Sequence, residues 1–195
     1  MKRFLLTVLG LLLISSASSQ VIINEYSCSN LNGPTDAYGL REDWIELYNM
    51  GASAVDLAGY YLSDNENNLT KWMIPSGSIP ANGFKMVFCS SRNTVNGNQY
   101  HPNFKLTQTD GEWIILANTF GNVVDSIKIV HMTKNDHSVG RSTNGAADWK
   151  LFTAPTPNAN NTGAVNFYTP TPVFSLTPGV RARFRLSSIR ASAVR

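Results

Sequence analysis

The feature that most constrains this chain is a series of short runs in which apolar and polar residues alternate. From residue 21 onward no window of a dozen residues has helical spacing, whereas alternation with a period of two is typical of half-buried β-strands. Asn-Gly pairs separate several runs, and such pairs favour the tight turns of β-hairpins. Seven or eight short strands predict an all-β, antiparallel β-sandwich. The expected strands are residues 21–27, 44–49, 55–62, 70–74, 84–90, 112–118, 123–130 and 148–152.

Two of these runs indicate where the core lies. In residues 44–49, Ile45 and Leu47 share one face, while Trp44, Glu46 and Tyr48 share the other, which must also be covered in part. Residues 113–116 are continuously apolar, as in a strand packed on both sides. We expect a core that contains Ile23, Ile45, Leu47, Leu57, Leu62, Val87, Ile115, Leu116 and Val124.

The first 19 residues have the pattern of a bacterial-type secretory signal. Lys2 and Arg3 precede a largely apolar run over residues 4–14, and small residues follow as far as Ser19. A membrane-spanning helix needs about 20 apolar residues, and this run is much shorter. We therefore expect a signal peptide over residues 1–19, cleavage after Ser19, no transmembrane segment after cleavage, and a secreted or cell-surface protein.

The two cysteines of the exported chain, Cys28 and Cys89, lie at the ends of expected strands. An oxidising compartment permits a disulfide between them. Cysteine is also a common buried apolar side chain. The sequence leaves both interpretations open.

The basic residues at the two ends of the chain produce its net charge of +3. Residues 21–180 contain nine of the 16 Lys and Arg and all 13 Asp and Glu, so their formal charge is 9 − 13 = −4. Neutralisation of phosphates by Lys and Arg supplies most nonspecific affinity for nucleic acid. A mildly acidic body therefore argues against nucleic acid as a partner.

The composition changes after residue 152. Residues 154–163 and 169–172 are rich in Pro, Thr and Asn, which is typical of an extended linker. Residues 174–179 are similar to the start of another β unit, whereas residues 180–195 carry five Arg and no acidic residue. We expect one domain over residues 20–162, a linker and the start of a second β unit over 163–179, and a basic tail over 180–195 that results from truncation or a shifted reading frame.

Several motifs, taken in order and spacing, resemble the lamin tail domain family in its bacterial secreted and surface form. They lie within residues 21–161 and include Ile22-Ile23-Asn24-Glu25, Asp43-Trp44-Ile45-Glu46-Leu47-Tyr48-Asn49, Val124-Asp125-Ser126, Ser138-Val139-Gly140-Arg141 and Pro155-Thr156-Pro157-Asn158.

The resemblance implies an immunoglobulin-like β-sandwich without catalytic activity. We expect a module that binds or adheres to an extracellular or cell-envelope ligand, either protein or glycan, or that positions partner domains. The alternative is an N-terminal accessory domain of a truncated extracellular enzyme, either a CotH-like kinase-fold protein or a nuclease.

Acidic residues offer the most plausible alternative chemistry. Glu25, Asp43 and Glu46 could supply a carboxylate pair for hydrolysis. The other interpretation is that these acids accept hydrogen bonds and fix strand ends, which the family resemblance favours. We therefore expect no catalytic residue.

Metal-binding patterns are also incomplete. The run 64–68 is oxygen-rich but lacks the spacing of an EF-hand calcium loop, and its composition is typical of a polar turn. The histidines fit no zinc spacing. We expect no metal and no cofactor, and we take Tyr60, Tyr61 and Trp72 as candidate anchors of a binding surface.

Overall fold

The computed structural model describes residues 20–108 and 111–168. The predicted signal peptide, the start of the second β unit and the basic tail lie outside the described residues. Those residues form thirteen strands and no helix, and therefore no helix that could cross a membrane. The strands are β1 (Val21–Ser27), β2 (Trp44–Asn49), β3 (Val55–Asp56), β4 (Tyr61–Ser63), β5 (Trp72–Met73), β6 (Ser78–Ile79), β7 (Phe84–Phe88), β8 (Thr94–Asn96), β9 (Gln99–His101), β10 (Trp113–Ala117), β11 (Val123–Lys128), β12 (Ser138–Arg141) and β13 (Trp149–Phe152).

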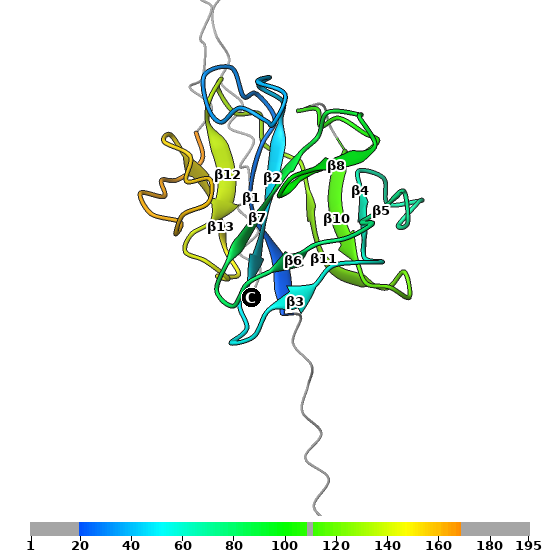
Figure 1. Cartoon of the computed structure of the whole chain (residues 1–195). Helices are drawn as coiled ribbons and strands as arrows, with labels where there is room; N and C mark the ends of the chain where they lie inside the picture. The colour runs from blue at the N-terminus through cyan, green and yellow to red at the C-terminus, as the bar shows by residue number, and fades with distance from the viewer. Residues whose placement is uncertain (1–19, 109–110, 169–195) are drawn as a thin grey trace, which may run out of the picture.

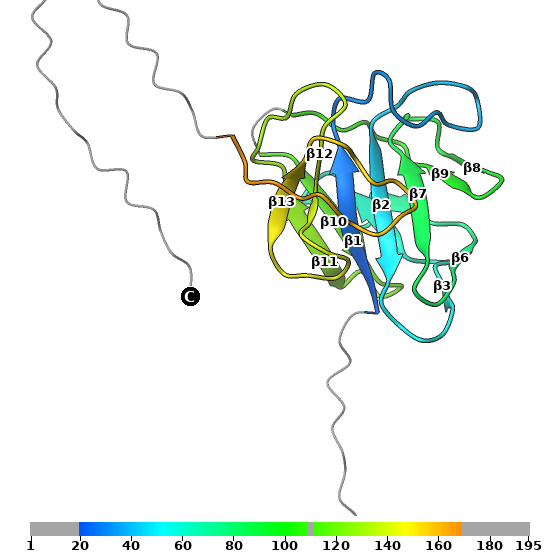
Figure 2. The same cartoon turned by 90° about the vertical axis from the view of Figure 1, so that its left-hand side faces the viewer.

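The strands form a two-layer sandwich, with a small third sheet at one end (Figure 1). The larger sheet has the order β13-β12-β1-β2-β7-β9-β8, the second has the order β11-β10-β4-β5, and β3 pairs with β6. Figure 2 shows the larger sheet in front of the second. The pairs are antiparallel except β7 with β9, which is parallel. The structure therefore confirms the predicted antiparallel β-sandwich.

The clearest alternating runs became strands with the predicted bounds, β1 and β2. The run 55–62 is instead divided into β3 and β4 by a turn that includes Gly59, whose φ is +81°. Strands β6, β8, β9 and β12 were not predicted. They have only two to four residues each, which is too short for alternation to be visible in the sequence.

The core prediction is confirmed in most positions. Ile115 is buried outside the main cluster, and Val124 is only half-buried against it, on the edge strand β11. The remaining predicted residues are fully buried in one cluster to which both sheets contribute: Ile23, Ile45, Leu47, Leu57, Leu62, Val87 and Leu116.

The segment after β13 corrects the expectation of an extended linker from residue 154. We call residues 154–161 the closing segment, because they cross the outer face of β1 and β2 (Figure 2). Hydrogen bonds from Thr156, Asn158 and Asn161 fasten it to the sheet. Beyond it, Val165 forms a β-bridge with Leu151. Alternation cannot reveal such packing, because polar side chains rather than apolar ones attach this segment.

Candidate functional site

Two acids of the motifs, Glu25 and Glu46, lie side by side on β1 and β2 under the closing segment. Both are 0% exposed. Glu25 accepts hydrogen bonds from the Ser138 hydroxyl, from the Thr156 backbone N–H at 3.0 Å and from the Thr156 hydroxyl at 2.6 Å. Glu46 accepts from the side-chain amide of Asn24 at 3.1 Å and from the Asn158 N–H at 2.5 Å. Each acid therefore holds the closing segment.

Burial dominates the ionisation of these two acids. It raises the pKa of Glu25 above its ordinary value and the pKa of Glu46 to about 8. The neighbouring charge of Glu25 adds to the rise at Glu46, whereas the hydrogen bonds from Asn24 and Asn158 oppose it. Because both side chains are covered by protein and already accept hydrogen bonds, this arrangement leaves no space between them for a substrate. Asp43 lies apart and accepts from the Asn30 N–H at 3.2 Å.

A bulge in β1 joins the motif at residues 22–25 to two other motifs. The pairing of β1 with β2 shifts between Ile23 and Glu25. The Ile23 N–H donates to Asp125 Oδ2 at 2.8 Å, and its carbonyl accepts from Arg141 Nε at 2.8 Å. Arg141 Nη2 also pairs with Asp125 Oδ2 at 2.8 Å. One ion pair therefore satisfies the backbone groups that the bulge leaves unpaired and links β1 to both β11 and β12.

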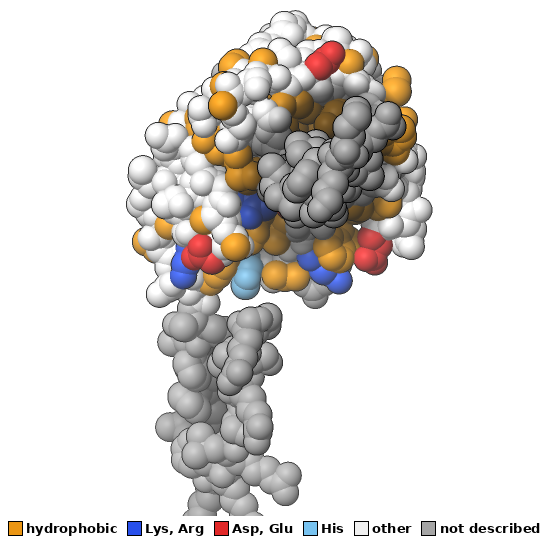
Figure 3. All heavy atoms as spheres, turned by 90° about the horizontal axis from the view of Figure 1, so that it is seen from below, with side chains coloured by type: hydrophobic (Ala, Val, Ile, Leu, Met, Phe, Trp, Pro, Cys, Tyr) orange, Lys and Arg blue, Asp and Glu red, His pale blue; other side chains and the backbone are white. Residues whose placement is uncertain are grey.

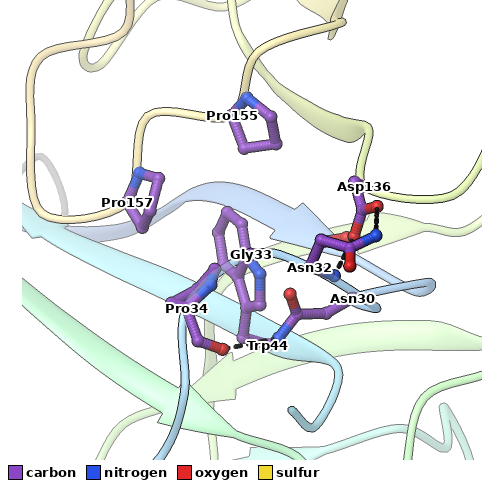
Figure 4. A pocket seen from close by; sticks show the side chains of 9 residues that line it. Asn30, Asn32, Gly33, Pro34, Trp44, Asp136, Pro155 and Pro157 are labelled. Atoms are coloured by element: carbon purple, nitrogen blue, oxygen red, sulfur yellow. Dashed lines mark hydrogen bonds between the residues drawn. The ribbon is translucent and has the colours of Figure 1, made fainter.

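The two prolines that flank Thr156 in the closing segment help to form a cavity, which we call the Trp44 pocket. It has a volume of about 340 Å³. Trp44 projects into it from β2, with Pro155 and Pro157 above and the loop after β1 at its side (Figure 4). The lining residues are Ser27, Asn30, Asn32, Gly33, Pro34, Trp44, Asp136, Pro155 and Pro157.

Most polar groups around this pocket are already engaged within the protein. Asn30 Nδ2 donates to the carbonyls of Pro34 at 2.8 Å and Glu42 at 2.9 Å. Asp136 accepts from the N–H groups of Leu31 at 2.7 Å and Asn32 at 2.6 Å, and from Asn32 Nδ2 at 2.8 Å.

The indole of Trp44 forms one wall of this pocket. The residue is only 1% exposed and packs in a small cluster with Met86 and Phe88. Three prolines, Pro34, Pro155 and Pro157, also line the pocket, so much of its wall is apolar. Apolar walls with a few polar groups at the side are typical of ligand pockets, which makes this cavity a candidate binding site.

The sequence model of the Lamin Tail Domain matches residues 14–131 of the chain. The chain belongs to the lamin tail domain family. No curated protein matches it. In this lamin tail domain, β12, β13 and the closing segment lie beyond the matched residues. Strand β12 nevertheless pairs with β1, β13 pairs with β12, and the closing segment hydrogen-bonds to Glu25 of β1 and Glu46 of β2.

The candidate anchors of the lamin tail domain do not form one exposed surface. Trp72, predicted as an exposed anchor, is buried at 4% exposure. Its Nε1–H donates to Asn93 Oδ1 at 3.0 Å, and its ring meets Tyr100 edge-on. Tyr60 and Tyr61 are both half-buried, and Tyr60 packs against the core. Trp72 is therefore a core residue, and that prediction is wrong.

The histidines of the lamin tail domain lie in separate environments. His131 stacks on Phe167, and Nδ1 of His137 forms a hydrogen bond with the Tyr168 hydroxyl. No group of three or more His, Cys, Asp or Glu among the described residues could hold a metal ion.

His101 belongs to a buried polar group that sequence reasoning missed. Its Nδ1 lies 3.0 Å from the Ser90 hydroxyl and 3.9 Å from Asp36 Oδ2, while its Nε2 has no partner among the described residues. Burial lowers the pKa of His101 and outweighs the opposing effect of Asp36. In a catalytic triad the serine and the acid lie on opposite ring nitrogens. Here both lie near Nδ1 and all three are buried, so the group does not form a triad.

Both cysteines are free thiols in the structure, not the disulfide that export permits. Cys28 is half-buried and packs against the core cluster that contains the fully buried Cys89. Burial raises the pKa of both thiols well above the ordinary value. A disulfide between them stays a prediction for the exported protein.

Proposed function

We propose that this lamin tail domain is an exported, non-catalytic module that binds or positions an extracellular or cell-envelope ligand through the Trp44 pocket. The observation that carries the proposal is the cavity itself, which the Trp44 ring and the rings of Pro34, Pro155 and Pro157 line at one end of the sandwich. Pockets that bind ligands combine apolar walls with a few placed polar groups. Loops on a rigid sandwich are also a frequent place for recognition.

The buried acids support the non-catalytic part of this proposal. Glu25 and Glu46 both lie under the closing segment and accept hydrogen bonds from it. Their role is therefore to hold the closing segment, whose residues Pro155 and Pro157 line the Trp44 pocket. A hydrolase would need at least one of these carboxylates open to a substrate.

The charge distribution supports a ligand other than nucleic acid. At the end of the molecule that carries β3, acidic and basic side chains are interspersed (Figure 3). Several cations of the body are also neutralised by acids, including Lys71 by Asp64 at 2.7 Å and Lys105 by Glu42 at 3.2 Å. Nonspecific binding to phosphates needs free cations along one face.

The binding function is tested by retention of ligand on the immobilised chain from Gln20 onward, offered cell-envelope glycans and envelope proteins. Trp44→Phe replaces the indole wall of the pocket with a smaller ring, so we expect it to weaken retention about tenfold. Trp113→Phe is the matched control, because Trp113 lies outside the Trp44 pocket. We expect this control to retain ligand as the wild type does.

Pro157→Ser provides a second test in case Trp44→Phe lowers stability. Pro157 is a half-buried wall of the pocket rather than a core residue, and its replacement should also weaken retention. Thermal unfolding of each variant separates loss of fold from loss of binding. Absence of any retained ligand, or equal retention by the wild type and both pocket variants, would contradict the proposal.

A further inference from the structure

Four asparagines of this lamin tail domain are followed directly by glycine, namely Asn32, Asn82, Asn96 and Asn144. At such a pair the backbone nitrogen of the glycine can attack the side-chain amide carbon of the asparagine, because glycine has no side chain to obstruct the approach. The attack requires a glycine N–H that is not held in a hydrogen bond and an asparagine side chain that is free to turn. The four pairs differ in these two respects.

Two of the pairs lie in turns whose glycine N–H is already bonded. Asn32 Nδ2 donates to Asp136 Oδ2 at 2.8 Å, and the Gly33 N–H also donates to Asp136. The Gly83 N–H, which follows Asn82, donates to the backbone carbonyl of residue 80 at 3.0 Å. In both turns a hydrogen bond must break before the glycine nitrogen can attack.

The pair at Asn144 is held by more hydrogen bonds than either of these. Asn144 Oδ1 accepts from the Asn161 N–H at 2.8 Å and from Asn24 Nδ2 at 3.3 Å. Asn144 Nδ2 donates to Asn160 Oδ1 at 2.7 Å. The Gly145 N–H faces Asn24 Oδ1 at 3.4 Å. Here both the side chain and the glycine N–H must leave their partners before a bond can form between them.

The pair Asn96-Gly97 is free in both respects. It lies where β8 turns into β9, and Asn96 pairs with Gln99 across a two-residue loop. Gly97 is the first residue of that loop and has a φ of +57°, as a tight hairpin turn requires there. Neither the Asn96 side chain nor the Gly97 N–H has a hydrogen-bond partner among the described residues. Gly97 is also exposed, and a Cβ on it would meet no atom within 4 Å.

We propose that Asn96 is a self-modification site, at which water converts the asparagine into aspartate or isoaspartate with loss of ammonia. The Gly97 nitrogen loses its proton and forms a bond with Asn96 Cγ, while the bond between Cγ and Nδ2 breaks and ammonia leaves. A water molecule then opens the five-membered ring at one of its two carbonyl carbons. Opening at one carbonyl leaves an aspartate, and opening at the other leaves an isoaspartate. Each conversion therefore consumes one water and releases one ammonia, and nothing is oxidised or reduced.

The two products change the hairpin in different ways. Both add a negative charge to the turn, and isoaspartate also adds one methylene group to the backbone between β8 and β9. The longer backbone disturbs the pairing of Asn96 with Gln99. Gln99 Oε1 accepts from the Ala37 N–H at 2.6 Å, so the altered turn also affects the attachment of the loop between β1 and β2. The inference goes beyond the proposed function, because the modification needs no ligand in the Trp44 pocket.

The test is incubation of the chain from Gln20 to Arg195 in mildly alkaline buffer, followed by protease digestion and mass spectrometry of the peptides that contain the four pairs. We expect the peptide with Asn96 to gain the mass difference between an amide and a carboxyl group at least about tenfold faster than the others, because the other pairs must first lose hydrogen bonds. In urea those hydrogen bonds are absent, and the four peptides should convert at similar rates.

Asn96→Gln should abolish the fast conversion, because glutamine would have to form a larger ring. Asn32→Gln is the matched control, because Asn32 is exposed and also precedes glycine, and it should leave the fast conversion unchanged. Three results would overturn the inference. The first is conversion at Asn96 no faster than at the other pairs of the folded chain. The second is an unchanged fast mass gain after Asn96→Gln. The third is the same preference for Asn96 in urea, since the neighbouring sequence rather than the fold would then cause it.

Discussion

Glu46 shows how a motif residue can serve the fold rather than a reaction. Its carboxyl group is fully buried and has a pKa of about 8 in the folded protein, against an ordinary value of 4.5. Between these values the folded state holds more protons at this site than the unfolded state. The contribution of Glu46 to the free energy of unfolding is therefore fully present below about pH 4.5 and is lost as the pH rises from there through 8.

Glu46→Gln tests this sign, because glutamine does not titrate. We expect the free energy of unfolding of the wild type, relative to that of the variant, to fall between about pH 5 and pH 8 by on the order of a few kcal/mol. The measurement is urea unfolding at several pH values. Taking the difference between the two proteins cancels the opposite trend from His101, whose folded pKa is lowered. A difference that stays constant or grows with pH would contradict the assignment.

At the scale of elements, the closing segment is the part of the fold that the sequence least revealed. The hydrophobic pattern places β1 and β2 correctly because alternation reports a buried face directly. The closing segment has no alternation, and hydrogen bonds to two buried acids attach it. Gly140 belongs to the same arrangement: a Cβ there would lie 3.0 Å from Phe152 and 3.1 Å from both Asn161 and Glu25. Sequence shows these residues as separate motifs and cannot show that they meet.

Thr156→Val tests the attachment of the closing segment. Valine keeps the size of threonine but removes the hydroxyl that donates to Glu25 at 2.6 Å, and it leaves a buried carboxylate with one donor fewer. We expect a loss of about 1.5–3 kcal/mol in the free energy of unfolding, as for a hydrogen bond to a charged group. Thr153→Val, at an exposed position of the same segment of chain, is the control and should change stability little. Similar urea midpoints for the two variants would show that the Thr156 hydroxyl does not hold the segment.

At the scale of the whole molecule, the sequence predicted the fold class, the family and most of the core, but not the candidate site. The pocket depends on three stretches that are distant in the chain, namely residues 27–44, Asp136 and residues 155–157. Trp44 is the one pocket residue that the sequence pattern indicates, because alternation in residues 44–49 places it on a second face of the strand that must be partly covered. Aromatic residues are frequent in binding surfaces, which makes Tyr60, Tyr61 and Trp72 candidates in the sequence, but the sequence does not reveal that Trp72 is buried in the core.

The N-terminal residues predict export of the whole chain. The signal pattern predicts that the chain expressed in a bacterial host leaves the cytoplasm and starts at Gln20 after cleavage. Mass spectrometry of the protein recovered outside the cytoplasm measures that start directly. Replacing the apolar residues Leu11 and Leu12 with Asp should keep the chain inside, because the apolar region would be broken. Recovery of the wild-type chain only in the cytoplasm, with its first residues intact, would contradict the prediction.

Glu25 and Glu46 hold the closing segment in place, and we propose that ligands bind in the Trp44 pocket that this segment helps to line. The most direct measurement is the NMR spectrum of the four tryptophan indoles while a retained ligand is added. We expect the Trp44 indole signal to move first and furthest, because a ligand in the pocket would contact this ring. Movement of the Trp113 or Trp149 signal with Trp44 unchanged would place recognition elsewhere and contradict the account.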